Sequence, residues 1–140
     1  MNNQEQYHEL AYYTLSHQSK DFIHQHIVDA FTAQVADEKT KPIAIVYALA
    51  GLYLYLVKNY TGKQVQMAHV RMSKGSKDFD KINLPKNRGN ITIQEVLLSS
   101  PGLERDKMIH QWCIDVWDAY KTEQEKVIAM TNKLLQKEIQ

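Results

Sequence analysis

Two histidines and an aspartate interrupt an apolar stretch in the first third of the chain. The segment FIHQHIVDAF at residues 22–31 carries His24, His26 and Asp29 among apolar residues. Imidazole and carboxylate groups transfer protons, bind divalent metal ions, or hydrogen-bond one another inside a core. Because buried polar groups need partners, we expect these three to meet polar side chains from other helices. The candidate partners are Tyr47, Tyr53, Tyr55, Tyr60, His69, Arg71, His110 and Trp112.

Helical spacing puts the three groups on different sides of one helix. His24 falls within the apolar face, together with Gln34. His26 and Asp29 are three residues apart and are therefore neighbours on another flank. We expect His24 to face inward and His26 to face partly outward.

Three interpretations of this cluster stay open. In the first, it is a buried hydrogen-bond network that fixes the packing of the helices. In the second, facing helices bind a divalent metal such as zinc, nickel or iron, and the candidate ligands are His24, His26, His69 and His110. In the third, His24 or Asp29 acts as acid or base in a small-molecule pocket. Cys113 is expected to be a small core residue rather than a nucleophile.

Length and composition indicate one ordinary domain over residues 1–140. The net charge is only +1. The single cysteine allows no internal disulfide, and this absence fits a cytoplasmic location. The apolar segment 42–57 is shorter than the roughly 20 residues of a membrane span, so we expect a soluble protein with a buried central helix there. Residues 63–88 are rich in lysine and arginine, but no nucleic-acid motif accompanies them, so nucleic-acid binding is not expected.

Helix signals dominate the chain, and we predict an all-α, single-domain bundle of five to six helices with a long C-terminal helix. Ser19 is the expected N-cap of the second helix, with Asp21 in its first turn. Gly62 is expected to close the third helix in the left-handed conformation. A long loop at 75–91 is expected to be functional or mobile. The predicted helices cover residues 4–15, 19 or 20 to 36, 42–59, 63–74, 92–98 and 101–138.

The last predicted helix carries a heptad seam with one charged break. Its members are Ile109, Cys113, Val116, Tyr120, Glu123, Val127, Met130 and Leu134. Unbroken, this helix would be about 55 Å long, whereas a domain of this size is about 37 Å across. The helix therefore either kinks near residues 121–124 or projects over residues 123–140 and pairs with another chain as a homodimer.

Four segments together resemble a known protein family. They are HQHIVDAFTAQ at residues 24–34, AHVRM at 68–72, NITIQEVLLS at 90–99 and WCIDVWDAY at 112–120. Their order and spacing are similar to those of a mainly bacterial family catalogued as a domain of unknown function. Two departures are Val35, where many members have histidine, and Tyr120, where the family has tryptophan.

The resemblance implies a set of signature positions without implying a reaction. These are His24, Gln25, Val28, Asp29, Gln34, His69, Arg71, Trp112 and Trp117. We expect the polar and aromatic members to converge on one buried site between the second, fourth and last helices. The first function hypothesis is a binding or interaction protein with a buried His/Asp cluster. The alternative is a metal-dependent enzyme of the helical-bundle type, whose cofactor and substrate the sequence does not identify.

Overall fold

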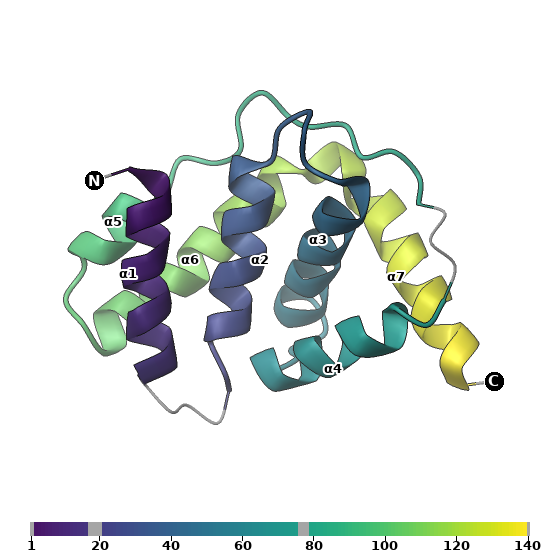
Figure 1. The fold of residues 1–140 in the computed structure, drawn as a ribbon, viewed down its shortest axis with the longest axis horizontal. Coiled ribbons are helices and arrows are strands. Elements are labelled where there is room, and N and C mark those ends of the chain that lie inside the picture. Colours follow the sequence, from purple (N-terminus) through teal and green to yellow (C-terminus); the bar gives the residue numbers. More distant parts are fainter. Residues whose placement is uncertain (1, 17–20, 76–78, 140) are drawn as a thin grey trace.

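The computed structural model describes residues 2–16, 21–75 and 79–139, and these residues form helices and loops without a β-strand. The expected all-helical fold is confirmed, but the described residues form seven α-helices instead of the expected five to six, because the last predicted helix is divided (Figure 1). The elements are α1 (Asn3–Ser16), α2 (His24–Val35), α3 (Pro42–Leu56), α4 (Gly62–Met72), α5 (Ile93–Leu98), α6 (Leu103–Ala119), the 3₁₀ turn η1 (Lys121–Glu123) and α7 (Gln124–Ile139).

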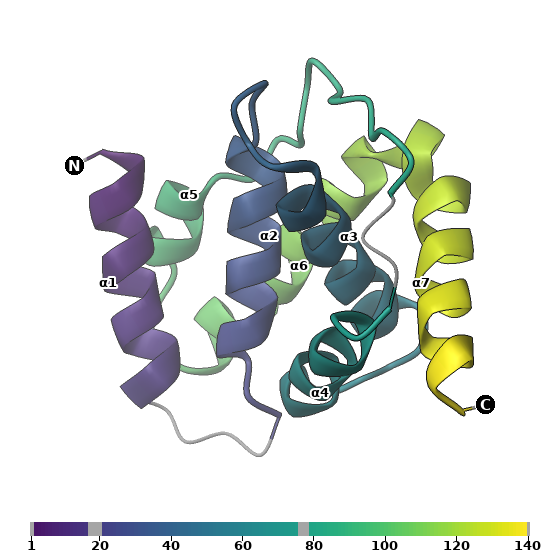
Figure 2. The same cartoon turned by 45° about the vertical axis from the view of Figure 1, so that its right-hand side comes forward.

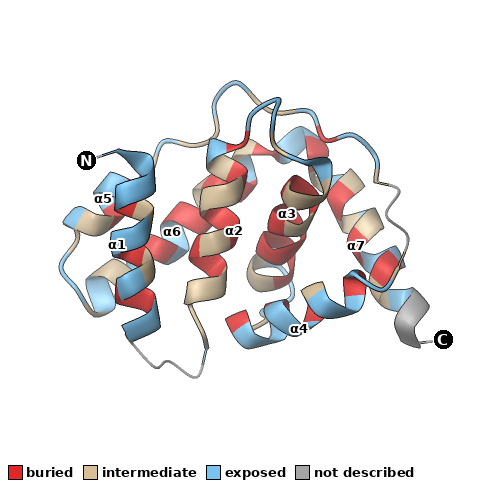
Figure 3. Ribbon diagram, viewed as in Figure 1, coloured by how far each residue is buried: buried red, intermediate tan, exposed pale blue. Residues whose placement is uncertain are grey.

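Helix α3 is the centre of the bundle because it is apolar nearly all round. From Ile45 to Leu54 every residue is buried except the half-buried Tyr47 (Figure 3). Helices α2, α4, α6 and α7 pack around it, as expected of a helix with no polar face. Among the residues described, no helix is both long and apolar enough to span a bilayer.

Helix α1 forms one edge of the molecule and is attached to the start of α6. It packs on α2 and α5 (Figures 1 and 2). The hydroxyl of Tyr13 donates to Oδ1 of Asp106 at 2.7 Å and accepts from the backbone N–H of Gly102 at 2.9 Å. The guanidinium of Arg105 lies 4.7 Å from the centre of the same ring. One buried tyrosine therefore joins the first helix to residues about 90 positions further along the chain.

The C-terminal helical region kinks where the sequence allowed a kink. Helix α6 ends at Ala119, and η1 separates it from α7. The heptad residues turn inward on both sides of this break, and all are buried except the half-buried Met130. The seam thus packs on the chain's own helices, and a homodimer through it remains a prediction that would need other residues of α6 and α7.

The start of α2 differs from the expectation. The helix begins at His24, and Asp21 therefore precedes it instead of occupying its first turn. The residue before the helix is Ile23, which has no capping side chain. The proposed cap Ser19 lies outside the described residues.

The turn between α3 and α4 also differs from the expectation, since Gly62 does not close α3. Gly62 is the first residue of α4, and Thr61 caps that helix by accepting a hydrogen bond from the N–H of Gln64 at 3.2 Å. The positive φ of this turn, 60°, belongs to Asn59. A side chain at position 62 would collide with the carbonyl of Phe22, so the close approach of two backbones requires this glycine.

Candidate functional site

Three ring side chains from three helices meet at one place. His26 of α2 lies flat against Tyr55 of α3, with 3.5 Å between ring centroids and 10° between ring planes. The Tyr55 hydroxyl lies 2.6 Å from Nδ1 of His110 on α6. Helices α2, α3 and α6 pack on one another pairwise, which brings these residues together from distant parts of the sequence.

A pocket of about 290 Å³ opens beside these rings, close to the lower size limit of ligand pockets. His26 is only 2% exposed, Tyr55 is half-buried and His110 is exposed, so the pocket runs from the surface toward the core. The turn between α3 and α4 supplies part of its wall. The lining residues are Asp21, Ile23, His26, Tyr55, Leu56, Asn59, Tyr60, Thr61 and His110.

Burial keeps the inner groups of this pocket uncharged at neutral pH. Burial, with a contribution from nearby His110, lowers the pKa of His26 to about 4. Burial raises the pKa of Tyr55, and Cys113 and Asp21 add to this. Within the described residues, Nδ1 of His26 is buried without a hydrogen-bond partner. The inner part of the pocket thus offers neutral hydrogen-bonding groups on aromatic walls, while Asp21 adds a carboxylate to the lining.

The predicted orientations of the two α2 histidines are wrong. His26 is the buried one, whereas His24 is half-buried at the first position of α2. His24 faces α1, and its Nδ1 lies 3.0 Å from the hydroxyl of Thr14. Helical spacing alone gave the wrong orientations because α3 and α6 cover the flank of α2 that carries His26, as well as its apolar face.

Asp29 occupies a separate, solvent-free position between α2 and α3. It is 3% exposed, and its Oδ1 accepts a hydrogen bond from Nε2 of Gln25 at 3.2 Å. Its Oδ2 is buried without a partner among the described residues and fills the space beside Gly51 where a side chain would otherwise be. Burial raises the pKa of Asp29 well above its usual value, although the Gln25 hydrogen bond opposes this.

Helix α4 carries two further predicted site residues, and they lie apart from the ring pocket. Nε2 of His69 donates to the backbone carbonyl of Tyr47 at 2.8 Å, and the two rings stack with centroids 5.3 Å apart. Burial lowers the pKa of His69, while this hydrogen bond opposes the shift. Arg71 is exposed on the outer side of α4.

Gln34 and Trp112 do meet, and together they hold the long loop. The indole Nε1 of Trp112 donates to Oε1 of Gln34 at 2.9 Å. Nε2 of Gln34 donates to the backbone carbonyls of Ile91 at 2.8 Å and Arg88 at 3.3 Å. The Gln34 side chain therefore links Trp112 of α6 to residues 88 and 91 of the loop.

Two carboxylates also hold this loop, and neither was predicted as a site residue from the sequence. Oδ2 of Asp115 accepts from the N–H groups of Asn90 at 2.6 Å and Ile91 at 2.7 Å. Oε1 of Glu123, the charged break in the heptad seam, accepts from the N–H of Asn83 at 2.8 Å. The described part of the loop is thus anchored at several points along its length.

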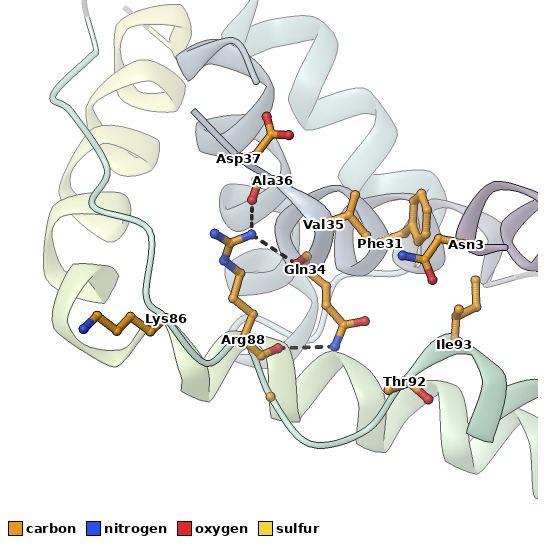
Figure 4. A pocket seen from close by; sticks show the side chains of 11 residues that line it. Asn3, Phe31, Gln34, Val35, Ala36, Asp37, Lys86, Arg88, Thr92 and Ile93 are labelled. Carbon is orange, nitrogen blue, oxygen red and sulfur yellow. Dashed lines mark hydrogen bonds between the residues drawn. The ribbon is translucent and has the colours of Figure 1, made fainter. Parts of the chain in front are cut away.

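A larger pocket, about 560 Å³, lies beside this attachment (Figure 4). The Arg88 guanidinium in its wall donates to the backbone carbonyls of Gln34 and Ala36 at the end of α2, where cations are favoured. Lys86 points away from the space in Figure 4. Its main cation therefore serves the helix terminus, and the other polar side chains of its lining include Asn3, Asp37 and Thr92.

The remaining predicted residues belong to the core. Trp117 is 6% exposed and lies 6.3 Å from the ring of Tyr53. Cys113 is fully buried, and its thiol points at the carbonyl of His26 at 3.7 Å. Burial raises the Cys113 pKa, as does Asp29, which is the reverse of what a nucleophilic thiol needs.

The predicted site residues are therefore distributed over several contacts. The structure joins His26 to His110 through Tyr55, and Gln34 to Trp112, while His24 and His69 have partners of their own. His24 and Gln34 are separated by about 15 Å along α2. Across residues 2–16, 21–75 and 79–139, no three His, Cys, Asp or Glu side chains gather as metal ligands would.

The fold and these contacts define an all-helical protein with buried polar groups between its helices. Residues 4–121 match the model of a family described as a family of unknown function (DUF5946). The chain belongs to this family, which confirms the expected relationship to a family without an assigned function. The chain matches no curated protein and no solved structure.

Proposed function

We propose that this protein binds a small molecule without transforming it, and that the ligand occupies the pocket of His26, Tyr55 and His110. The observation that carries the proposal is the convergence of these three rings from α2, α3 and α6 on a single pocket. Pockets of this kind combine aromatic walls with a few fixed polar groups.

The protonation states favour binding over acid–base catalysis. A general acid or base works best when its pKa is near the operating pH. The pKa of His26 is about 4, and that of Tyr55 is raised by burial, so both stay neutral near pH 7. Because the Tyr55 contact uses Nδ1 of His110, Nε2 of this exposed ring is left to contact a ligand.

Probe binding to matched variants tests this proposal. Phenol, imidazole and acetamide are added separately to the wild type, and their affinities are measured by saturation-transfer NMR. Tyr55→Phe keeps the ring but loses the hydroxyl that orients His110. Tyr12→Phe, at an exposed position of α1, makes the same chemical change away from the pocket.

We expect at least one probe to bind the wild type and Tyr12→Phe equally, and to bind Tyr55→Phe several-fold more weakly. The proposal fails if no probe binds, or if Tyr55→Phe binds every probe as well as the wild type does.

The alternative of a metal-dependent enzyme receives less support. Its candidate ligands His24 and His69 have other partners, the Thr14 hydroxyl and the Tyr47 carbonyl, and no cluster of three donors occurs among the described side chains. We also infer a cytoplasmic location, which the single, buried, unpaired thiol of Cys113 supports.

A further inference from the structure

The larger pocket has a side next to α1, away from the guanidinium of Arg88. Figure 4 shows the side chains of Asn3, Phe31, Thr92 and Ile93 around this side, and all four line the pocket. They come from α1, from α2, from the residue before α5 and from α5 itself. We call this part the α1 side of the larger pocket.

The wall of the α1 side is apolar and held in place. Phe31 is half-buried, and the ring of Tyr7 on α1 stacks on it with 4.5 Å between ring centroids and 24° between ring planes. Ile93 is 3% exposed, and Val35, which is 40% exposed, extends the wall. Because α1 and the core hold these side chains, the wall is a preformed surface for the C–H groups of a ligand.

Uncharged polar groups lie beside this wall. The exposed amide of Asn3 makes no hydrogen bond to another described residue, so it offers both donors and an acceptor. The Thr92 hydroxyl accepts from the N–H of Glu95 at 3.3 Å and keeps its own hydrogen to donate. The amide oxygen of Gln34 accepts from Trp112 and has a second lone pair. In Figure 4 this oxygen points toward the α1 side.

The ionisable groups of the larger pocket lie away from the α1 side. The guanidinium of Arg88 is bound to carbonyls at the end of α2, and Lys86 points away from the space. Asp37 lies beyond Ala36 in Figure 4, with its carboxylate directed away from Thr92. A charged ligand would lose water here without gaining an ionised partner, so the α1 side favours an uncharged one.

A hydroxylated ring matches both the wall and the polar groups. Its hydroxyls donate and accept at the same time, which suits a surface where Thr92 supplies a donor, Gln34 an acceptor and an amide both. Its ring C–H groups can pack against Phe31 and Ile93. The whole pocket, about 560 Å³, is within the size range of small-molecule sites.

We propose that the α1 side of the larger pocket binds a neutral saccharide, with the C–H face of a sugar ring on Phe31 and its hydroxyls bonded to Asn3 and Thr92. This site is separate from the ring pocket, because the two pockets share no lining residue. Each neutral hydrogen bond to the sugar replaces one to water and contributes little. The expected Kd for a single sugar ring is therefore on the order of 1 mM.

Saturation-transfer NMR tests the site with the methyl glycosides of glucose, galactose, mannose and N-acetylglucosamine. Tetrahydropyran is the matched probe, since it has the ring without the hydroxyls. Asn3→Ala removes the amide, and Gln4→Ala, at the neighbouring exposed position, is its control. Phe31→Leu removes the aromatic wall, and Phe79→Leu, half-buried beside Tyr47, is its control. Circular dichroism checks that each variant is folded.

We expect at least one glycoside to bind the wild type, and tetrahydropyran to bind at least about threefold more weakly. Asn3→Ala and Phe31→Leu should each raise the Kd of that glycoside at least about threefold, whereas both controls keep the wild-type value. Tyr55→Phe, which changes the ring pocket, should bind the glycoside as the wild type does.

Three results would overturn the proposal: no glycoside binds, tetrahydropyran binds as tightly as the best glycoside, or Asn3→Ala and Phe31→Leu both bind like the wild type. Glycoside binding that is lost in Tyr55→Phe and kept in Phe31→Leu would also overturn it. That last result would place the saccharide in the ring pocket and leave the proposed function standing.

Discussion

The imidazole of His26 lies parallel to the phenol ring of Tyr55, 3.5 Å from it, and the hydroxyl of Tyr55 in turn contacts His110. The nearly solvent-free imidazole of His26 thus lies behind the Tyr55 ring, and the hydroxyl end of that ring faces the pocket. The walls of the pocket are thus fixed by stacking between α2 and α3 before any ligand enters. Preorganisation of this kind reduces the cost of binding.

Replacement of His26 by phenylalanine should remove part of the acid sensitivity of the fold. The His26 pKa is about 4 in the folded chain and about 6.5 in an unfolded chain. As the pH falls through this interval the unfolded state binds a proton first, so the unfolding free energy falls by up to about 1.4 kcal/mol per pH unit. Urea unfolding of His26→Phe between pH 7 and pH 4.5 should show a clearly smaller loss than the wild type.

His8→Phe is the control for this experiment because His8 is exposed on α1. If the wild type and His26→Phe lose stability in parallel on acidification, His26 is not held neutral by its surroundings.

Asp29→Asn should stabilise the protein at neutral pH. Burial raises the pKa of Asp29 above that of an unfolded aspartate, so the unfolded state ionises first as the pH rises from about 4. The wild type therefore loses up to about 1.4 kcal/mol of unfolding free energy per pH unit until the folded-state pKa is reached. An asparagine cannot ionise and can still accept the Gln25 hydrogen bond.

Urea unfolding at several pH values checks this expectation, with Asp118→Asn on the exposed side of α6 as the control. The stability advantage of Asp29→Asn should grow from pH 4.5 to pH 7.5. An advantage that does not change with pH would contradict a raised pKa at Asp29.

Gly51→Ala should destabilise the fold mainly through Asp29. A methyl group at position 51 would overlap Oδ2 of Asp29 and lie 3.2 Å from Cγ1 of Val65. We expect a cost of about 2 kcal/mol or more, as for other overpacked cores, and at most half of that cost in an Asp29→Ala background. A double-mutant cycle from chemical unfolding measures the coupling; additive effects would mean that the two residues do not compete for this space.

Asp115→Ala should release part of the long loop while leaving the helices folded. The carboxylate accepts two loop N–H groups, from Asn90 and Ile91, and charge-assisted hydrogen bonds of this type contribute about 1.5–3 kcal/mol. Amide hydrogen exchange at residues 90 and 91 should accelerate at least about tenfold. Asp118→Ala should leave both amides unchanged, and equal protection in Asp115→Ala would show that other contacts fix the loop.

Protein purified without a metal-binding tag should contain much less than one metal ion per chain, because no three suitable ligands gather among the described residues. Plasma mass spectrometry gives the metal content, and thermal melts with and without a chelator should coincide. Near-stoichiometric metal that is lost together with stability in His24→Ala would contradict this and favour the metal-site hypothesis.

The helical class and most helix positions followed from local sequence signals: the predicted ranges 42–59 and 92–98 contain α3, which begins at Pro42, and α5, which Thr92 caps. The comparison of helix length with domain size left two alternatives, a kink near residues 121–124 or a projecting helix, and the structure has the kink. The orientation of His26 could not be predicted, because it depends on how closely α3 and α6 cover α2. Asp115 and Arg88 were missed for a related reason, since their partners lie 24 or more residues away.

The most direct test of the ligand pocket is a set of intermolecular NOEs between the best-binding probe and the protein. The account predicts NOEs from the probe to ring protons of Tyr55 and His110, and loss of these NOEs in Tyr55→Phe. The account would be contradicted by NOEs only to side chains of the larger pocket, such as Phe31 and Ile93, or by the absence of any NOE between the probe and a side chain.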